Sequence, residues 1–163
     1  MSPPLTGLWI SIPRIFYSLD KVPDKYRHVW ISRKQNAHAP VLNAVKLKQA
    51  GAHLAPDRDS ELDSPVNAPA PHTGMPPCYI PVDGLDPLRD DGLIYERILH
   101  EHGVRTRIDV WPGVPHAHFA FLPMLKSAQE GNIDTILGIG WLLGRQDVDR
   151  EAAAKAYGAP AGA

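Results

Sequence analysis

Cysteine is almost absent from this sequence, because Cys78 is the only one among 163 residues. A single cysteine excludes an internal disulfide framework and a cysteine-based zinc site. No apolar run in the sequence approaches the roughly 20 residues that a membrane-spanning helix needs. The first residues also lack the basic-then-apolar order of a signal peptide. We therefore expect a soluble, cytoplasmic protein that does not associate with a membrane.

An excess of charge of one sign is also missing, since the formal net charge at pH 7 is -1. This balance argues against nucleic acid as a partner. Hydrophobic residues make up 44% of the chain and charged residues 21%, which is typical of a folded domain and not of a disordered one. Proline is abundant, with 17 residues, and its even spread along the chain indicates frequent loops.

The first half of the chain has little regular pattern. Residues 1–19 contain one apolar stretch, Leu8–Ile12, which predicts the first core strand and is expected to be buried. Residues 20–76 are irregular and resemble a cap or pocket segment. Within them, residues 40–51 predict a short helix with proline in its first turn and glycine at its end. Residues 55–71 are loop by composition.

The second half is regular, and the order of its elements predicts an α/β fold. A strand, a helix, a strand and a helix are expected, in this order, within residues 77–147, at Cys78–Val82, Gly92–His102, Thr106–Trp111 and Asn132–Gly144. This alternation implies parallel strands joined by right-handed crossovers, in a sheet of about three strands. Residues 148–163 are rich in alanine and glycine and predict a flexible tail.

Candidate catalytic residues follow the two strands of this second half. Asp86 comes after the first of them, and His116 and His118 come after the second. Working residues of an open parallel sheet gather beyond the carboxyl ends of its strands. An aspartate that orients a histidine forms two of the three parts of a nucleophilic triad, and the order acid then histidine is that of α/β-hydrolases.

The pair His116 and His118 also has a metal-binding interpretation, because residues i and i+2 of an extended segment share a face. The sequence offers no obvious third ligand, so we expect no metal and no cofactor. Cys78 lies in an expected buried strand and predicts an inert core thiol.

Two segments resemble a known family. The stretch Gly84-Leu-Asp-Pro-Leu-Arg-Asp-Asp-Gly-Leu93 and the stretch Trp111-Pro-Gly-Val-Pro-His116 are similar to the C-terminal part of α/β-hydrolase fold esterases. The branch that they resemble is the hormone-sensitive-lipase-like carboxylesterases of fungi, and the resemblance covers roughly residues 5–145. It implies that Asp86 is the triad acid, that His116 is the triad base, and that the substrates are small or medium carboxylic esters.

The sequence also departs from this family. It contains neither the Gly-x-Ser-x-Gly elbow of the nucleophile nor the His-Gly-Gly loop of the oxyanion hole. In the family both motifs precede the segment that matches here, so we expect that the N-terminal half of the fold is absent and that the lone chain does not hydrolyse esters by the triad route. The family's usual Pro-His-Gly-Phe is replaced by Pro115–Phe119, which adds His118.

Three hypotheses for the function follow. The chain is the C-terminal portion of a carboxylic-ester hydrolase, in which residues 20–71 help to form the acyl pocket or its lid. Alternatively, it is a repurposed acid/base catalyst such as a dehydratase, isomerase or cyclase of a biosynthetic pathway, which uses Asp86, His116 and His118. The third hypothesis is a non-catalytic remnant or partner subunit. The apolar edge of the first strand needs cover, either from a second copy in a homodimer or from the missing half.

Overall fold

A parallel sheet of three strands lies between two long helices. The computed structural model describes residues 5–70, 72–145 and 147–158 of the chain. The strands lie in the order β1-β2-β3, and both neighbouring pairs are parallel, with Cys78 opposite Leu8 on one side and Thr106 on the other. Their bounds are β1 Leu8–Trp9, β2 Cys78–Asp83 and β3 Thr106–Trp111. The α/β class and the parallel pairing expected from the sequence are confirmed.

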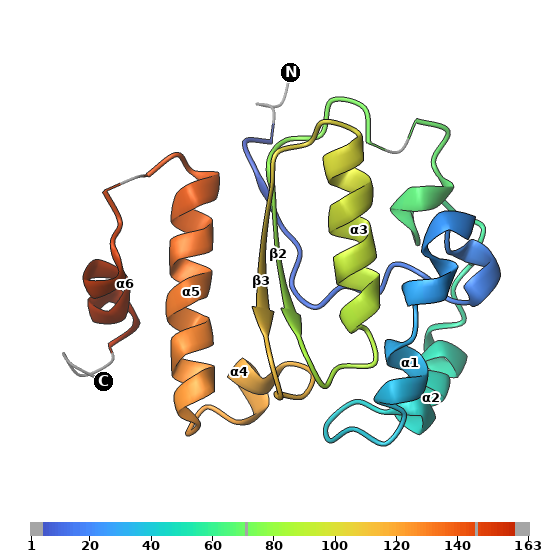
Figure 1. Ribbon diagram of the computed structural model, residues 1–163, viewed down its shortest axis with the longest axis horizontal. Helices are drawn as coiled ribbons and strands as arrows, with labels where there is room; N and C mark the ends of the chain where they lie inside the picture. The colour runs from blue at the N-terminus through green and yellow to red at the C-terminus, as the bar shows by residue number, and fades with distance from the viewer. Residues whose placement is uncertain (1–4, 71, 146, 159–163) are drawn as a thin grey trace.

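The helices are distributed on both sides of this sheet. Helix α3 lies on one side of β2 and β3 and α5 on the other, while α1 and α2 lie beyond α3 (Figure 1). No helix in the described parts of the chain is long and apolar enough to cross a membrane. The helices are α1 Ser32–Gln35, α2 Ala44–Leu54, α3 Arg89–Glu101, α4 His118–Phe121, α5 Lys126–Leu142 and α6 Arg150–Tyr157, and 3-10 turns occur at Leu19–Lys21, Asp24–Val29 and Pro65–Asn67.

The main core lies between β2 and α3. Every residue of β2 is buried, because a central parallel strand is covered by helices on both faces and carries a continuous apolar run. Helix α3 presents Ile94, Ile98 and Leu99 to this core, at the spacing of one helical stripe. The expected helix is thus confirmed, with its start three residues earlier, at Arg89.

Helix α5 approaches the opposite face of the sheet through a glycine. A Cβ atom placed on Gly138 would lie 2.1 Å from Cε1 of Tyr79, so only glycine fits there. The Tyr79 hydroxyl donates a hydrogen bond to Asp109, at 2.8 Å. This buried tyrosine therefore fixes the distance between α5 and β2.

Strand β1 differs from the buried strand that the sequence predicted. Its regular pairing is limited to Leu8–Trp9, and the side chain of Trp9 is 47% exposed. The backbone N–H groups of Ile10 and Ile12 still donate to β2, but Ile12 has a positive φ of 44°. This conformation ends the extended backbone. The expectation of burial was wrong because β1 lies at an edge of the described sheet.

Two further helices start at other places than expected. Asn43 caps α2 by accepting a hydrogen bond from the backbone N–H of Lys46, so the helix begins after the proline turn and includes Gly51. Helix α5 starts at Lys126 and not at the expected Asn132. The sequence did not reveal this earlier start, because the first two turns carry few apolar residues and show no helical periodicity. A side-chain cap therefore marks the start of α2, whereas the N-cap residue of α5 makes no side-chain capping hydrogen bond.

The segment after α5 also differs from the expected tail. Asp149 caps α6 by accepting from the backbone N–H of Ala152, and the side chain of Ala153 is fully buried. Arg150 forms an ion pair with Asp134 of α5. At Arg150–Tyr157 the structure therefore has a capped helix packed on α5, where the sequence predicted a flexible tail. The part of the expected tail at 159–163 lies outside the described residues.

Candidate active site

Two loops meet at the carboxyl ends of β2 and β3. The backbone N–H of Gly84 donates to the carbonyl of Trp111 at 2.8 Å, and the N–H of Leu85 donates to the carbonyl of Val114 at 2.9 Å. A Cβ atom on Gly84 would lie 3.0 Å from the backbone nitrogen of Gly113. The close approach of the loops thus depends on glycine at position 84.

Asp86 and His116 form a hydrogen-bonded pair across these loops. Oδ2 of Asp86 lies 2.6 Å from Nδ1 of His116. The other carboxylate oxygen accepts a hydrogen bond from the backbone N–H of Leu88 at 2.8 Å. The side chain of Asp86 is 1% exposed, whereas that of His116 is 21% exposed. The acid is therefore enclosed and fixed, and part of the imidazole remains open to an approaching group.

The irregular segment before β2 also supports this pair. Asn36, which follows α1, donates from its side-chain amide to the carbonyl of Asp86 at 2.9 Å and to that of Gly84 at 3.2 Å. Asn36 is buried, so both bonds are shielded from water. Sequence reasoning missed this residue, because an asparagine in a loop carries no pattern that reveals a partner 50 residues away.

A second pair of the same kind lies beside the first. Nδ1 of His118 is 2.9 Å from Oδ1 of Asp83, and Nε2 of His118 is 3.2 Å from the carbonyl of Ser127 in α5. Both side chains are almost completely buried. His118 thus does not share an open face with His116, and the metal-binding geometry of two imidazoles on one face does not occur.

Burial affects the acid of this second pair. It raises the pKa of Asp83, while His118 acts in the opposite direction. The second carboxylate oxygen of Asp83 is buried without a hydrogen-bond partner among the described residues. Asp83 therefore depends on His118 for the only side-chain hydrogen bond that the structure gives it.

Comparison with known proteins assigns the chain to a family. A family model described as the alpha/beta hydrolase fold matches residues 5–120. The chain belongs to the alpha/beta hydrolase fold family. A fission yeast relative (Schizosaccharomyces pombe), named an AB hydrolase superfamily protein, is 34% identical over 143 residues, which are 88% of this chain and 42% of the relative.

Other relatives place the chain in the hormone-sensitive-lipase-like branch of this family. Versiconal hemiacetal acetate esterase of Dothistroma septosporum is 29% identical over 76% of this chain and 38% of its own length. Brefeldin A esterase, described as a bacterial homologue of human hormone sensitive lipase, is 26% identical with a TM-score of 0.65, over 86% of this chain and 40% of that structure.

A cyclase is also similar. The crystal structure of vibralactone cyclase superimposes with a TM-score of 0.81 and 32% identity, over 88% of this chain and 42% of the cyclase. The chain thus spans about two fifths of the length of the hydrolase-fold proteins that it matches.

The hydrolase-fold core shows no metal centre in the part of the chain that the structure describes. No group of three or more His, Cys, Asp or Glu side chains there could hold a metal ion. Burial raises the pKa of the Cys78 thiol to about 12, so the thiol is neutral at physiological pH. That the protein needs no cofactor stays a prediction.

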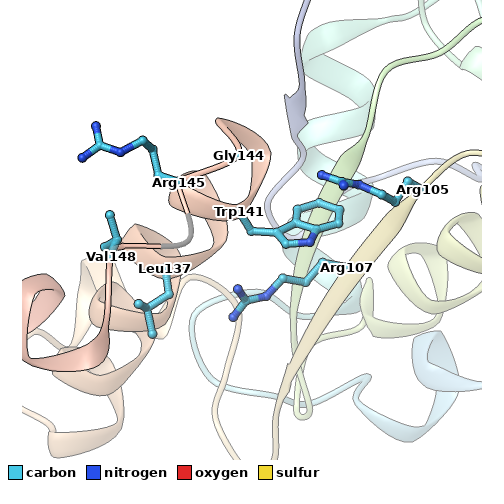
Figure 2. A pocket seen from close by; sticks show the side chains of 7 residues that line it. All are labelled: Arg105, Arg107, Leu137, Trp141, Gly144, Arg145 and Val148. Carbon is cyan, nitrogen blue, oxygen red and sulfur yellow. The ribbon is translucent and has the colours of Figure 1, made fainter.

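A pocket of about 310 Å³ lies beside the start of β3, at the other end of this strand from the loop that carries His116 (Figure 2). It is lined by three arginines, with the Arg105 guanidinium above the ring of Trp141. Arg107 contacts Asp109, and Arg145 forms an ion pair with Asp147. Nearby carboxylates thus balance most of its charge.

Proposed function

We propose that Asp86 and His116 are the acid and the base of a serine-hydrolase triad in a carboxylic-ester hydrolase. The observation that carries the proposal is the hydrogen bond of 2.6 Å between Asp86 and Nδ1 of His116 at the carboxyl ends of neighbouring parallel strands. Catalytic residues of open parallel sheets gather at this edge. The names of the esterase relatives support the same class of reaction.

The proposed roles follow from the two ring nitrogens of His116. Nδ1 carries a proton that it donates to Asp86, which leaves Nε2 as the acceptor for the proton of a serine hydroxyl. Nε2 then returns this proton to the oxygen of the leaving alcohol. Asp86 keeps the tautomer and stabilises the imidazolium, and it can do so because Leu88 and Asn36 fix its position.

The nucleophile is proposed to come from outside these 163 residues. The sequence contains no serine in a Gly-x-Ser-x-Gly elbow and no His-Gly-Gly loop. The match to about two fifths of the length of the relatives supports a missing part of the fold that carries both. The exposed side chains of Leu5 and Trp9 support cover over the β1 edge, either from that part or from a second copy in a homodimer.

The proposed substrates are small or medium carboxylic esters. Residues 20–71 are proposed to form part of the acyl pocket or its lid. Their direct contact with the acid loop through Asn36 supports this role. A cytoplasmic location stays a prediction.

The test starts from the native protein in its source. We expect an intact mass well above 17.9 kDa, labelling by a serine-directed fluorophosphonate, and hydrolysis of p-nitrophenyl acetate. In that protein, Asp86→Asn should lower kcat by about 10⁴-fold, because the imidazole adopts the wrong tautomer. His116→Ala should lower it at least as much. A native mass of 17.9 kDa without labelling would contradict the proposal.

A second candidate is an acid/base catalyst that forms a ring. The similarity to vibralactone cyclase favours it, and the same Asp86–His116 pair would move the proton. Product analysis separates the two candidates, because a hydrolase releases a free acid and an alcohol whereas a cyclase releases a ring that keeps both parts. If the 163-residue chain alone forms the ring product, and its formation requires His116, the repurposed catalyst is the better description.

A further inference from the structure

A second pocket, of about 350 Å³, lies among the segment after β1, helix α1 and helix α2. These helices lie on the far side of α3 from the sheet (Figure 1). Four cationic side chains and one aromatic ring form its wall, namely Arg14, Arg33, Lys48, Arg58 and Tyr17. This concentration of positive charge is unusual in a chain whose net charge is -1.

The ring of Tyr17 holds two of the cations close together. The guanidinium carbon of Arg14 lies 3.9 Å from the ring centroid, and that of Arg58 lies 5.5 Å from it. Gly51 of α2 lies beside this arrangement, since a Cβ atom there would be in ordinary contact, at 3.6 Å, with Nη2 of Arg14. Like charges brought this close repel each other unless an anion lies between or beside them.

Only one of the four cations has a carboxylate partner among the described residues. Arg33 forms an ion pair with Asp91 at 3.0 Å. Arg14, Lys48 and Arg58 form no ion pair in the described parts of the chain, and Nε of Arg14 is buried there without a hydrogen-bond partner. Burial lowers the pKa of Arg14, and the charges of Arg33 and Arg58 act in the same direction, while Tyr17 and Asp91 act in the opposite one.

The carboxylates nearby are already engaged. Asp91 also accepts hydrogen bonds from the backbone N–H groups of Ile15 and Phe16, and Asp63 accepts one from the Tyr17 hydroxyl at 2.8 Å. Among the described residues, four cationic side chains and no carboxylate line the pocket, so its wall carries an excess of positive charge. A ligand with more than one negative charge would offset this excess.

We propose that this pocket binds the phosphate group of a small phosphorylated molecule. Guanidinium groups offer planar pairs of N–H donors that match phosphate oxygens, and Lys48 adds a flexible point charge. A phosphate monoester carries close to two negative charges at neutral pH. A volume of about 350 Å³ also leaves room for a small organic body against Tyr17.

The site is independent of the proposed triad. Its cationic residues make no hydrogen bond to Asp86 or His116 in the described structure. Binding can therefore be measured without any catalytic assay, and a failed esterase test would leave this proposal standing.

The test is isothermal titration of the 163-residue chain with inorganic pyrophosphate at low ionic strength. Lys48→Gln and Arg58→Gln each change an exposed side chain, so folding should be unaffected. Each should weaken binding by about tenfold, because a hydrogen bond to a charged group is lost. Arg14→Gln should weaken it at least as much. The matched control is Arg97→Gln on the exposed face of α3, with an expected change below about twofold.

The outcomes divide clearly. Saturable binding that the three pocket variants weaken and the control leaves unchanged supports the proposal. Absence of pyrophosphate binding overturns it, and so does an equal loss in Arg97→Gln, which would indicate non-specific charge attraction. A parallel titration with tricarballylate tests the chemistry of the anion, since tighter binding of the carboxylate than of pyrophosphate would also overturn a phosphate site.

Discussion

Replacement of His118 by alanine should destabilise the protein strongly, whereas the same change at His116 should not. The two histidines lie two positions apart; His118 contacts Asp83 at the end of β2, and His116 contacts Asp86 in the loop that follows. The Asp83–His118 pair is buried, with side-chain exposures of 3% and 1%. His116 is partly exposed. The structure thus separates a structural pair from the proposed catalytic pair.

The magnitude follows from what each aspartate retains. After His118→Ala, Asp83 keeps no side-chain hydrogen bond among the described residues, and removal of one partner of a buried ion pair costs about 3–5 kcal/mol. After His116→Ala, Asp86 keeps the N–H of Leu88, and we expect a loss of about 1 kcal/mol. The free energy of unfolding of a small domain is about 5–15 kcal/mol in total, so the loss expected for His118→Ala is severe.

Urea denaturation of the 163-residue chain, followed by circular dichroism, measures both values. The double variant Asp83→Ala with His118→Ala completes a mutant cycle. It should be less destabilised than the two single losses together, because neither partner remains as an unpaired buried charge. Equal stability of the His116 and His118 variants would refute the reasoning, and so would additive single losses.

The pH dependence of the His118→Ala variant provides a second check. Removal of His118 removes an influence that lowers the pKa of Asp83, so burial raises this pKa further above 3.8 in the folded variant. A raised pKa in the folded state gives stability that is present below pH 3.8 and is lost as the pH rises through the folded value. The deficit of the variant relative to the unsubstituted chain should therefore shrink as the solution is acidified from neutral pH.

Three further outcomes are expected. Gly138→Ala should destabilise the protein by about 1–3 kcal/mol, because its Cβ would collide with Tyr79. Gly140→Ala in the same helix meets nothing closer than 3.5 Å and should stabilise by up to about 1 kcal/mol; equal effects in urea denaturation would contradict both. Cys78 should react with Ellman's reagent only after unfolding, since its pKa is raised to about 12. Because the pKa of Asp83 is raised in the folded state, this residue makes the protein less stable as the pH rises above 3.8. Asp83→Asn should remove this part of the pH dependence, as measured by thermal unfolding.

The second half of the chain was more predictable than the first. The strand Thr106–Trp111 has the predicted bounds, because turn residues and a change of hydrophobic period mark both ends in the sequence. Helix α3 was found for the same reason. The start of α5 was missed because its first two turns carry almost no apolar residues, and the cap of α2 was missed because Asn43 accepts a hydrogen bond from the local backbone, which leaves no apolar pattern.

The sequence by itself determined the α/β class and placed Asp86 and His116 beyond the ends of neighbouring strands. It did so because periodicity and turn residues are local properties. Only the tertiary structure decided which aspartate meets which histidine. The register of β2 against β3 and the contact of Gly84 with Trp111 bring Asp86 to the open imidazole. The same register buries His118 against a different carboxylate, and no local pattern encodes that choice.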